Sequence, residues 1–335
     1  MIEYHNGIHI KGTRLWLDAR RKTEFSFVSH AHVDHAVRHK EILSTKETAR
    51  LYEHRLGKAK FNILEYNRPK RLEGVKVELF PSGHILGGAQ ILIQKDGVRI
   101  VYTGDFKLRG SLTTEKAEIK KCDLLILEST FGLPQYVFPP VKEVHARMAE
   151  FVEEAQRRGE IPIFLAYSLG KAQEAMKILS NRGYKLSVHG TINDIAKIYE
   201  EFGVRFNNWE CYRANHLEGQ VLIIPPWAKT TRMIGNIPRK RVAILTGWAI
   251  DQGAKDHFGV DEAIPLSDHA DFSELLEYVK KAQPKKIYTV HGFPEFVGFL
   301  REAGFDAELL KENTKVKTIY SQKLPTNYDL FCQIQ

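Results

Sequence analysis

Cysteine is scarce in this sequence of 335 residues, which contains only Cys122, Cys211 and Cys332. Because the three lie far apart in the chain, neither a disulfide framework nor a CxxC-type zinc site is available. No apolar run reaches the roughly 18 residues that a membrane-spanning helix needs, so we expect no contact with a membrane. The first residues also lack the apolar core of a signal peptide, which predicts a cytoplasmic protein.

The charges are unbalanced, since 49 Lys and Arg residues face 41 Asp and Glu residues and give a formal net charge of +8. Hydrophobic residues make up 43% of the chain. This composition excludes a disordered acidic chain and a collagen-like chain. The basic surplus indicates a polyanionic partner only weakly, because net charge also serves solubility. The length predicts roughly two domains.

Short apolar runs alternate with helical patterns along the chain, which predicts an α/β fold. The expected strands are residues 25–28, 75–80, 91–93, 98–102, 124–127, 161–165, 221–224, 242–245 and 287–290. The expected helices are residues 46–55, 141–157, 171–179, 192–201, 272–281 and 295–302. The proline-rich residues 132–140 interrupt this rhythm and predict a boundary. We expect a smaller α/β unit at 134–245, inserted into a discontinuous domain formed by the rest.

A cluster of histidines at residues 29–35 (Ser-His-Ala-His-Val-Asp-His) follows the first of these strands. Imidazole and carboxylate groups are natural ligands of Zn²⁺ and similar ions. His30 and His32 are two residues apart, so in an extended loop they point the same way. Asp34 and His35 can aim at a second point. A solvated polar loop is the simpler explanation, but the preceding strand places this loop at a sheet edge and favours a metal site.

Single metal-competent residues recur at similar positions elsewhere. His84, Asp105 and His291 follow predicted strands, and Asp18 ends the apolar run at 15–17. Taken singly, each is more often a cap or a turn residue. Together with the cluster they predict a binuclear metal site.

These motifs resemble the metallo-β-lactamase superfamily, whose members carry His-x-His-x-Asp-His after a strand. Three further motifs resemble its β-CASP nuclease branch. They are residues 125–132 (LILESTFG, with Glu128), 266–272 (LSDHADF, with His269) and 288–292 (YTVHG, with His291). The resemblance implies an αββα metallo-β-lactamase sandwich at 1–133 and 246–335, with an inserted α/β β-CASP domain at 134–245.

The resemblance also implies the cofactor, two Zn²⁺ ions, with Mn²⁺ as an alternative activating metal. One ion would be bound by His30, His32 and His84, and the other by Asp34, His35 and His291. Asp105 and a hydroxide would bridge the ions, and Asp18 would orient a ligand histidine. The implied catalytic residues are Asp34, Asp105, Glu128 and His269.

A phosphodiester suits this chemistry, because two cations polarise its oxygens and activate water as the nucleophile. The bridging hydroxide would attack phosphorus. His269, paired with Glu128, would not bind metal but would protonate the leaving oxygen as a general acid. The simpler explanation for His269 is a position next to the N-cap of the helix near Phe272. Its resemblance to the family motif together with Glu128 favours the catalytic role.

Substrate contacts are predicted in the inserted unit. Ser168, Gly170 and Lys171 open the helix at 171–179, where backbone N–H groups suit a phosphate. A plain Ser/Gly helix cap explains these residues equally well. Trp248 is a further candidate, and with Tyr136, Tyr167 and Trp227 it forms a set of aromatic residues that can stack on bases. Most such aromatic residues are core residues.

The kind of nucleic acid is predicted from two motifs. His291 is typical of RNA-processing members of the branch. The pair Gly247-Trp248 and the string at 266–272 resemble ligase-associated DNA exonucleases, and therefore DNA is slightly favoured, with exonuclease action. The alternative is an RNA nuclease of the mRNA 3'-end processing or RNase J type. The sequence also resembles archaeal-type nucleases of the mRNA 3'-end processing kind.

Three other classes are considered. A small-molecule hydrolase of the same superfamily would not need Glu128, His269 or the inserted domain. A non-catalytic nucleic-acid-binding subunit would not need a complete ligand set. A basic DNA-binding module with a structural zinc would be expected to bind it through cysteines. A homodimer and partners in repair or RNA processing are left open.

Overall fold

The computed structural model describes residues 1–214 and 217–316. Cys332 and the part of the predicted discontinuous domain beyond residue 316 lie outside the described residues. The chain divides into two compact units. Unit 1 comprises residues 1–109, 115–137 and those from 269 onward, and unit 2 comprises residues 110–114 and 138–268. Within the described ranges, no helix is long and apolar enough to cross a membrane.

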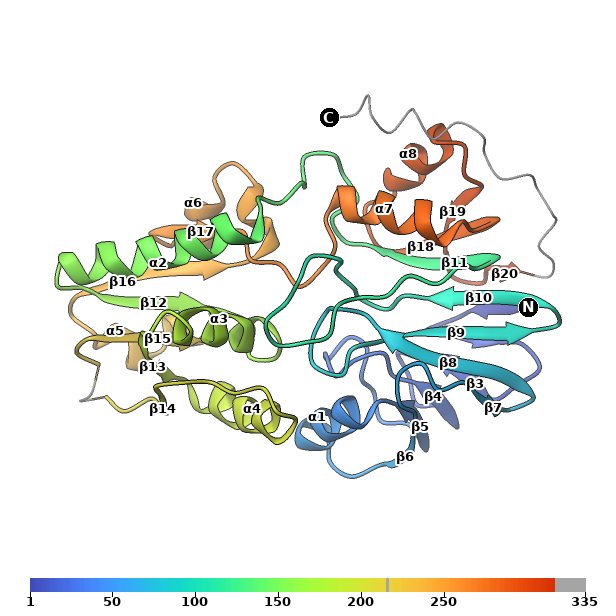
Figure 1. Ribbon diagram of the computed structural model, residues 1–335, viewed down its shortest axis with the longest axis horizontal. Coiled ribbons are helices and arrows are strands. Elements are labelled where there is room, and N and C mark those ends of the chain that lie inside the picture. Colours follow the sequence, from blue (N-terminus) through green and yellow to red (C-terminus); the bar gives the residue numbers. More distant parts are fainter. Residues whose placement is uncertain (215–216, 317–335) are drawn as a thin grey trace. The chain divides into compact units, whose positions relative to one another are not determined.

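Unit 1 contains two mixed β-sheets, each with seven described strands (Figure 1). The first has the order β20-β1-β2-β3-β4-β5-β6. Its strands are β1 (Ile2–Tyr4), β2 (Ile8–Ile10), β3 (Leu15–Leu17), β4 (Phe25–Phe27), β5 (Glu41–Ser44), β6 (Lys60–Ile63) and β20 (Lys315–Val316). The second has the order β19-β18-β11-β10-β9-β8-β7. Its strands are β7 (Lys70–Leu72), β8 (Val75–Pro81), β9 (Ala89–Lys95), β10 (Val98–Tyr102), β11 (Leu124–Ser129), β18 (Lys286–Gly292) and β19 (Ala307–Leu309).

The two sheets of unit 1 pack face to face because alternate residues of their strands are apolar. Leu15 and Leu17 of β3 share one core cluster with Val77 and Leu79 of β8. Helices cover the outer faces (Figure 1): α1 (Lys46–Leu56) covers the first sheet, and α7 (Phe272–Ala282) and α8 (Phe296–Glu302) cover the second. The predicted αββα sandwich is therefore confirmed.

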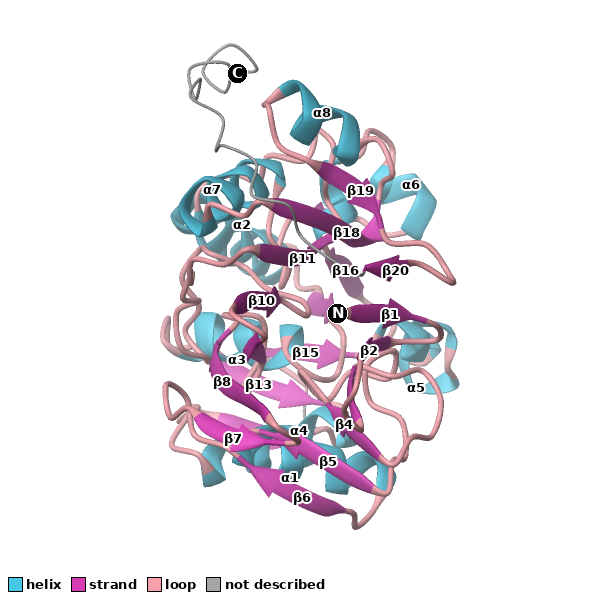
Figure 2. Ribbon diagram, turned by 90° about the vertical axis from the view of Figure 1, so that its right-hand side faces the viewer, coloured by secondary structure: helices cyan, strands magenta, loops and turns pink. Residues whose placement is uncertain are grey.

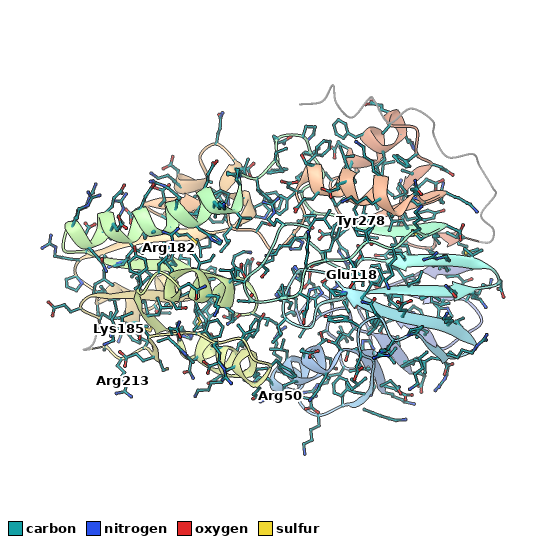
Figure 3. All side chains as sticks on the ribbon, in the orientation of Figure 1. Arg50, Glu118, Arg182, Lys185, Arg213 and Tyr278 are labelled. Atoms are coloured by element: carbon teal, nitrogen blue, oxygen red, sulfur yellow. The ribbon has the colours of Figure 1, made fainter. Side chains whose placement is uncertain are left out.

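Helix α7 is fixed at its N-terminus, next to a predicted catalytic residue. Asp271 and Glu274 form a capping box, with Asp271 Oδ1 accepting from the Glu274 N–H at 2.9 Å. Arg109 donates to Asp271 Oδ2 at 2.6 Å and to Glu274 Oε2 at 2.9 Å. Tyr278, labelled in Figure 3, is buried and donates from its hydroxyl to a β9 glutamine. These contacts therefore fix the backbone next to His269, which lies two residues before the N-cap residue Asp271.

Unit 2 contains one parallel sheet of the order β14-β13-β15-β12-β16-β17 among the described residues (Figure 1). Figure 2 labels its strands β13, β15 and β16. Its strands are β12 (Ile161–Leu165), β13 (Lys185–Val188), β14 (Trp209–Cys211), β15 (Gln220–Ile224), β16 (Lys240–Leu245) and β17 (Glu262–Ile264). Its helices are α2 (Val141–Arg157), α3 (Lys171–Ser180), α4 (Gly190–Glu201), α5 (Arg232–Gly235) and α6 (Ala254–Phe258), with 3₁₀ turns η1 (Pro226–Thr230) and η2 (Gly247–Ile250).

The unit 2 sheet is buried on both faces, as parallel sheets usually are. Phe164 of β12 packs on Phe151 of α2, with ring centroids 5.1 Å apart. Its neighbours Ile163 and Leu165 point the other way, into an apolar cluster with Ile234 of α5. One strand thus serves two cores, and its carboxyl end lies at the same edge as those of the other strands.

The compact units divide at a different place from the predicted insertion. The sequence predicted that the chain leaves the inserted domain after residue 245. In the structure, β17 adds in parallel to β16, with Ile244 opposite Ala263, and unit 2 continues to Asp268. The physical reason is that an edge strand of only three residues carries too little pattern to be read from sequence. That units 1 and 2 correspond to the metallo-β-lactamase and β-CASP domains of the family stays a prediction.

Candidate metal centre

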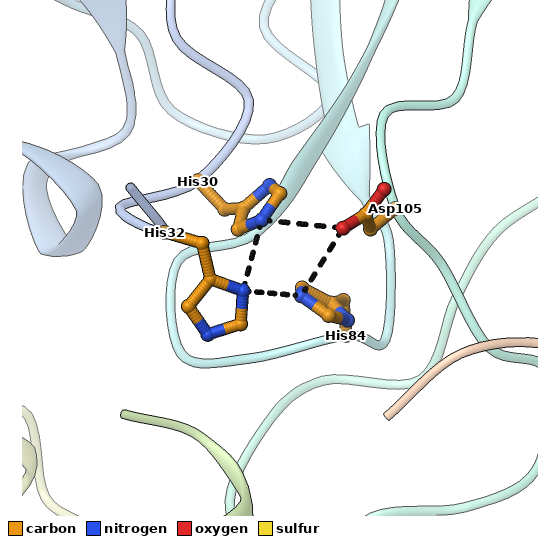
Figure 4. A group of neighbouring side chains, drawn as sticks. All are labelled: His30, His32, His84 and Asp105. Atoms are coloured by element: carbon orange, nitrogen blue, oxygen red, sulfur yellow. Dashed lines mark hydrogen bonds and ion pairs between the residues drawn. The ribbon is translucent and has the colours of Figure 1, made fainter. Parts of the chain in front are cut away.

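Three histidine side chains from two loops of unit 1 meet at one point (Figure 4). His30 and His32 lie on the loop after β4, and His84 lies on the loop after β8. The Nε2 atoms of His30 and His84 each lie 3.1 Å from Nδ1 of His32. These are the three histidines that were predicted to bind one metal ion.

The Asp105 carboxylate lies between two groups of histidines. Its Oδ2 is 3.5 Å from Nε2 of His30 and 3.8 Å from Nε2 of His84. Its Oδ1 is 3.5 Å from Nε2 of His35. Gly104, with φ +52°, permits this approach, because a Cβ there would lie only 2.7 Å from the Cβ of Ser29. One carboxylate therefore faces both predicted metal positions.

The second predicted ligand set is looser than the first. Asp34 Oδ2 lies 3.6 Å from Nε2 of His35, and the Asp34 side chain is 68% exposed. The rings of His35 and His291 have centroids 5.2 Å apart. His291 has φ +51° and sits at a bulge, where β18 changes register against β11. The bulge turns a side chain that would otherwise follow the pleat of the strand.

Asp18 organises the histidines from behind. Its Oδ2 accepts from Nδ1 of His35 at 2.7 Å, from the Ser29 hydroxyl at 2.6 Å and from the Tyr102 hydroxyl at 2.8 Å. Since the Ser29 hydroxyl gives its proton to Asp18, its oxygen accepts from Nδ1 of His30 at 2.9 Å. Both rings are thereby held with Nε2 facing Asp105 and its neighbours, and in the neutral form of each ring this Nε2 carries a lone pair.

The pKa values of His30, His35 and His291 are shifted in different directions by their surroundings. Burial lowers the pKa of His30 well below its ordinary value, and the neighbouring His35 and His84 lower it further. Burial also opposes the charged form of His35, but Asp105 and Asp18 outweigh it and raise the pKa of His35 to about 10. Burial lowers the pKa of His291. The surroundings of His35 thus favour a positive charge.

These residues fit a zinc ion. A tetrahedral zinc with Zn–N bonds of 2.0–2.1 Å has ligand nitrogens about 3.3 Å apart, close to the 3.1 Å separations found here. His30 is held as a lone-pair donor, and its depressed pKa keeps it neutral, as a ligand must be. His30, His32, His84 and Asp105 can therefore hold a metal ion.

His269 and Glu128 form a pair beside this group. Nδ1 of His269 lies 3.0 Å from Glu128 Oε2 and 3.2 Å from Glu128 Oε1. Glu128 is fully buried and accepts from the Phe106 N–H at 2.8 Å and from the Thr130 hydroxyl at 2.7 Å. Nε2 of His269 lies 4.0 Å from Asp105 Oδ2. Asp105, Glu128 and His269 are also close enough to one another to hold a metal ion.

The predicted substrate residues of unit 2 are less free than the sequence suggested. Lys171 is buried, and its Nζ lies 3.2 Å from Asp268 Oδ2. The Gly170 N–H donates to the Gln173 side chain at 2.8 Å, and so it is not open to a phosphate. The Ser168 hydroxyl lies 3.3 Å from that of Thr191.

The aromatic residues predicted to stack on bases differ in their exposure. Trp248 is 36% exposed and lines a cavity of about 430 Å³ with His257 and Phe258. Tyr136 is buried and stacks on Phe293, so it is a core residue. Tyr167 and Trp227 are exposed.

Several residues around the site were missed by the sequence reasoning. Ser29 and Tyr102 support Asp18, Thr130 supports Glu128, and the Arg20 guanidinium donates to Nδ1 of His291 at 3.2 Å. Ser29 and Thr130 lie within motifs that were recognised, so their position was a usable signal. Tyr102 and Arg20 gave none, because their partners are distant in sequence.

The fold and the side-chain group together define a class of protein. An αββα sandwich that gathers histidines and aspartates at the carboxyl ends of its strands is the architecture of a metallo-β-lactamase-type metallo-hydrolase. Comparison with known proteins narrows this class. Residues 262–318 match the family described as "Zn-dependent metallo-hydrolase RNA specificity domain". The chain belongs to the β-CASP branch of the metallo-β-lactamase superfamily.

Three similar proteins illustrate the relationship. The chain is 36% identical over 320 residues to a "Probable DNA ligase" of Opitutus terrae, covering 94% of this chain and 32% of that protein. It is 27% identical over 338 residues to an "RNase J-like protein" of Methanocaldococcus jannaschii, covering 79% and 80%. A solved structure from Enterococcus faecalis V583, titled as a protein of unknown function, shares the fold with a TM-score of 0.60 and 15% identity, covering 87% and 80%. The chain thus spans about a third of the first relative.

Proposed function

We propose that this protein is a metal-dependent nuclease that hydrolyses phosphodiester bonds of DNA, as an exonuclease. The observation that carries the proposal is the position of Asp105. Its two oxygens face two histidine groups, and the His269–Glu128 pair lies on the Oδ2 side. A shared carboxylate with a proton donor beside it is suited to a two-metal hydrolase.

Two zinc ions fit the ligands, with Mn²⁺ as an alternative. His30, His32 and His84 would hold one ion, Asp34, His35 and His291 the other, and Asp105 both. When bound, the ions would act as Lewis acids on the phosphoryl oxygens and lower the pKa of water so that it attacks phosphorus at neutral pH. Asp18 keeps His30 and His35 oriented for this task.

His269 supplies the proton that the leaving oxygen needs. As the bond from phosphorus to this oxygen breaks, Nε2 of His269 donates its proton to the oxygen, and the products are a phosphate monoester and an alcohol. Glu128 holds Nδ1 of His269 and stabilises the imidazolium form before the transfer. Glu128 is itself fixed by Phe106 and Thr130, so the ring has one orientation.

DNA as the substrate is supported by the Gly247-Trp248 pair and by the similarity of nearly the whole chain to the "Probable DNA ligase". RNA is the second candidate. It is supported by His291, by the match at 262–318 and by the similarity to the "RNase J-like protein" along most of both chains. Ser168, Gly170, Lys171 and Trp248 stay proposed substrate-binding residues, although the salt bridge of Lys171 to Asp268 reduces its use as a phosphate ligand.

The test is cleavage of end-labelled single- and double-stranded DNA and RNA of one sequence, with Zn²⁺ or Mn²⁺ and with a chelator. We expect metal-dependent cleavage of DNA, with products that shorten from one end. Asp105→Asn is the inactive control. Cleavage of RNA alone would replace DNA by RNA in the proposal. Binding without cleavage of any polymer would instead favour a non-catalytic nucleic-acid-binding subunit.

A further inference from the structure

Three neighbouring strands of the unit 2 sheet end in aromatic side chains that the proposed mechanism does not use. His189 directly follows β13, Trp227 lies three residues after β15, and Tyr167 lies two residues after β12. The strand order β13-β15-β12 makes these three ends adjacent. Ligands of open parallel sheets bind outside the carboxyl ends of the strands. We call these three residues the aromatic edge.

The rings of the aromatic edge are available to a ligand. Tyr167 is 64% exposed and Trp227 is 60% exposed, although large rings are usually buried. The His189 ring meets Trp227 edge to face, with centroids 5.1 Å apart and planes at 86°. Lys171 Nζ lies 5.3 Å from the centroid of the Tyr167 ring. Both large rings are therefore supported by a neighbour of unit 2 and remain more than half exposed.

Polar contacts hold the loops of the aromatic edge together. The hydroxyls of Ser168 and Thr191 lie 3.3 Å apart and join the loops after β12 and β13. Nδ1 of His189 accepts from the Thr191 N–H at 3.2 Å and lies 3.0 Å from the Thr191 hydroxyl. The surface is thus organised before any ligand arrives, which lowers the entropy cost of binding.

The charge around the aromatic edge fits a polyanion. The segments 166–170, 189–192 and 225–231, which build the three loops, contain no Asp and no Glu. Proteins bind single-stranded nucleic acid with a positively charged surface and aromatic rings on which bases stack. Here the loops carry exposed rings and Lys229, and the nearby Asp268 carboxylate is buried against Lys171.

We propose that the aromatic edge binds single-stranded nucleic acid by stacking nucleobases on Trp227 and Tyr167, with His189 bracing Trp227 from the side. The proposal rests on the proposed function, because the occupant is the polymer that the metal centre would cut. Stacking is tolerant of sequence, since every base has a π-face.

The test measures binding of a fluorescent oligothymidylate of about 12 nucleotides to the full chain by anisotropy, in chelator so that the strand stays intact. Trp227→Ala and Tyr167→Ala should each weaken binding about fivefold or more, the lower end of what one stacked base contributes. Trp227→Phe, which keeps a ring, should recover most of the affinity. Because both rings are exposed, these variants should melt at the temperature of the wild type.

Two controls separate stacking from charge. An abasic strand of equal length keeps the phosphates, so wild type and Trp227→Ala should bind it equally. Lys185→Ala removes a charge at the opposite end of β13 (Figure 3), where the side chain is 60% exposed, and should change binding little. Unchanged affinity of Trp227→Ala and Tyr167→Ala for the thymidylate, or an equal loss with the abasic strand, would overturn the proposal.

Cleavage of the same strand by the wild type with Zn²⁺ or Mn²⁺ is measured separately. Cleavage together with ring-independent binding would overturn the aromatic edge and leave the nuclease proposal intact. Ring-dependent binding without cleavage of any polymer would overturn the nuclease proposal and support the aromatic edge.

Discussion

Asp18 accepts a hydrogen bond from Nδ1 of His35 at 2.7 Å, in the buried part of the candidate metal centre. The carboxylate is held by further donors, the Ser29 hydroxyl and the Tyr102 hydroxyl, and its backbone has φ +42°. A residue held in such a conformation by several partners is over-determined by its surroundings. Asp18 therefore acts as the fixed point from which His30 and His35 take their orientation.

Replacing Asp18 by Asn should weaken metal binding without unfolding the protein. The amide keeps the size of the side chain but removes the negative charge that accepts from His35. Loss of such a partner typically lowers metal affinity about 10–100-fold. Competition with a chromophoric zinc chelator measures this change. Asp96→Asn, at a side chain that is 83% exposed, is the matched control and should bind zinc as the wild type does. Equal affinities for both variants would show that Asp18 does not orient a ligand.

Removing His269 should separate proton donation from metal binding. We expect His269→Ala to keep the zinc content of the wild type and to lose about 10²–10⁴-fold in turnover, the usual contribution of a general acid. His84→Ala should lose zinc, because its Nε2 belongs to the first histidine group. Elemental analysis and cleavage rates decide between the two. Loss of zinc from His269→Ala would instead make Asp105, Glu128 and His269 a ligand set.

His39 should make the fold sensitive to acid. Its Nδ1 accepts from the Thr23 N–H at 3.2 Å, and its Nε2 is buried without a hydrogen-bond partner in the described part of the chain. Burial lowers the pKa of His39 to about 4, against about 6.5 in the unfolded chain. Because the pKa of His39 is lower in the folded protein than in the unfolded chain, His39 contributes to the stability of the fold. This contribution is fully present above about pH 6.5 and is lost as the pH falls toward 4.

Between about pH 7 and pH 5 this loss amounts to about 2 kcal/mol in the free energy of unfolding. His39→Gln removes the titrating group, so its urea-unfolding free energy should fall less over the same interval. Both proteins share all other titrating groups, which makes the difference specific. A pH dependence identical in the two proteins would rule out this role for His39.

Gly292→Ala should disturb the bulge that carries His291. A Cβ at Gly292, where φ is +155°, would lie 1.8 Å from the Ser129 carbonyl oxygen, so the backbone has to shift. We expect a loss of about 1–3 kcal/mol in stability, and weaker metal binding through His291. Gly298→Ala in α8 is the control, since nothing lies within 4 Å of its Cβ, and it should be neutral or stabilising. Thermal melts and zinc titrations of both variants test this, and an unaltered Gly292→Ala protein would contradict it.

The sequence predicted long, strongly patterned elements well. The strands at 98–102 and 161–165 and the helix at 141–157 have the predicted bounds. Most short strands were not predicted, because two to four residues carry too little periodicity to separate a strand from a loop. These are β1, β2, β5, β6, β7, β13, β14, β17, β19 and β20. Unit 2 also includes β17, one of these short strands, which lies beyond the predicted end of the insertion at residue 245.

For the candidate site too, the sequence predicted some residues and missed others. The sequence identified the histidines and aspartates that meet in unit 1, because their spacing follows strand ends. It did not identify Ser29, Tyr102, Thr130 or Arg20 as their supports. It also overestimated Lys171, whose charge is engaged by Asp268. The partners of Tyr102, Arg20 and Lys171 are distant in sequence and leave no local signal, so these contacts have to be seen in the fold.

By itself, the sequence determined which residues can bind a metal and where the long strands and helices run, because ligand chemistry and periodicity are local properties. Only the tertiary structure decided that Asp105 faces two histidine groups, that Asp18 sets the tautomers of His30 and His35, and that Tyr167, His189 and Trp227 share one edge. These relationships depend on which strands become neighbours. Strand order is set by packing across the whole unit, and no short stretch of sequence contains it.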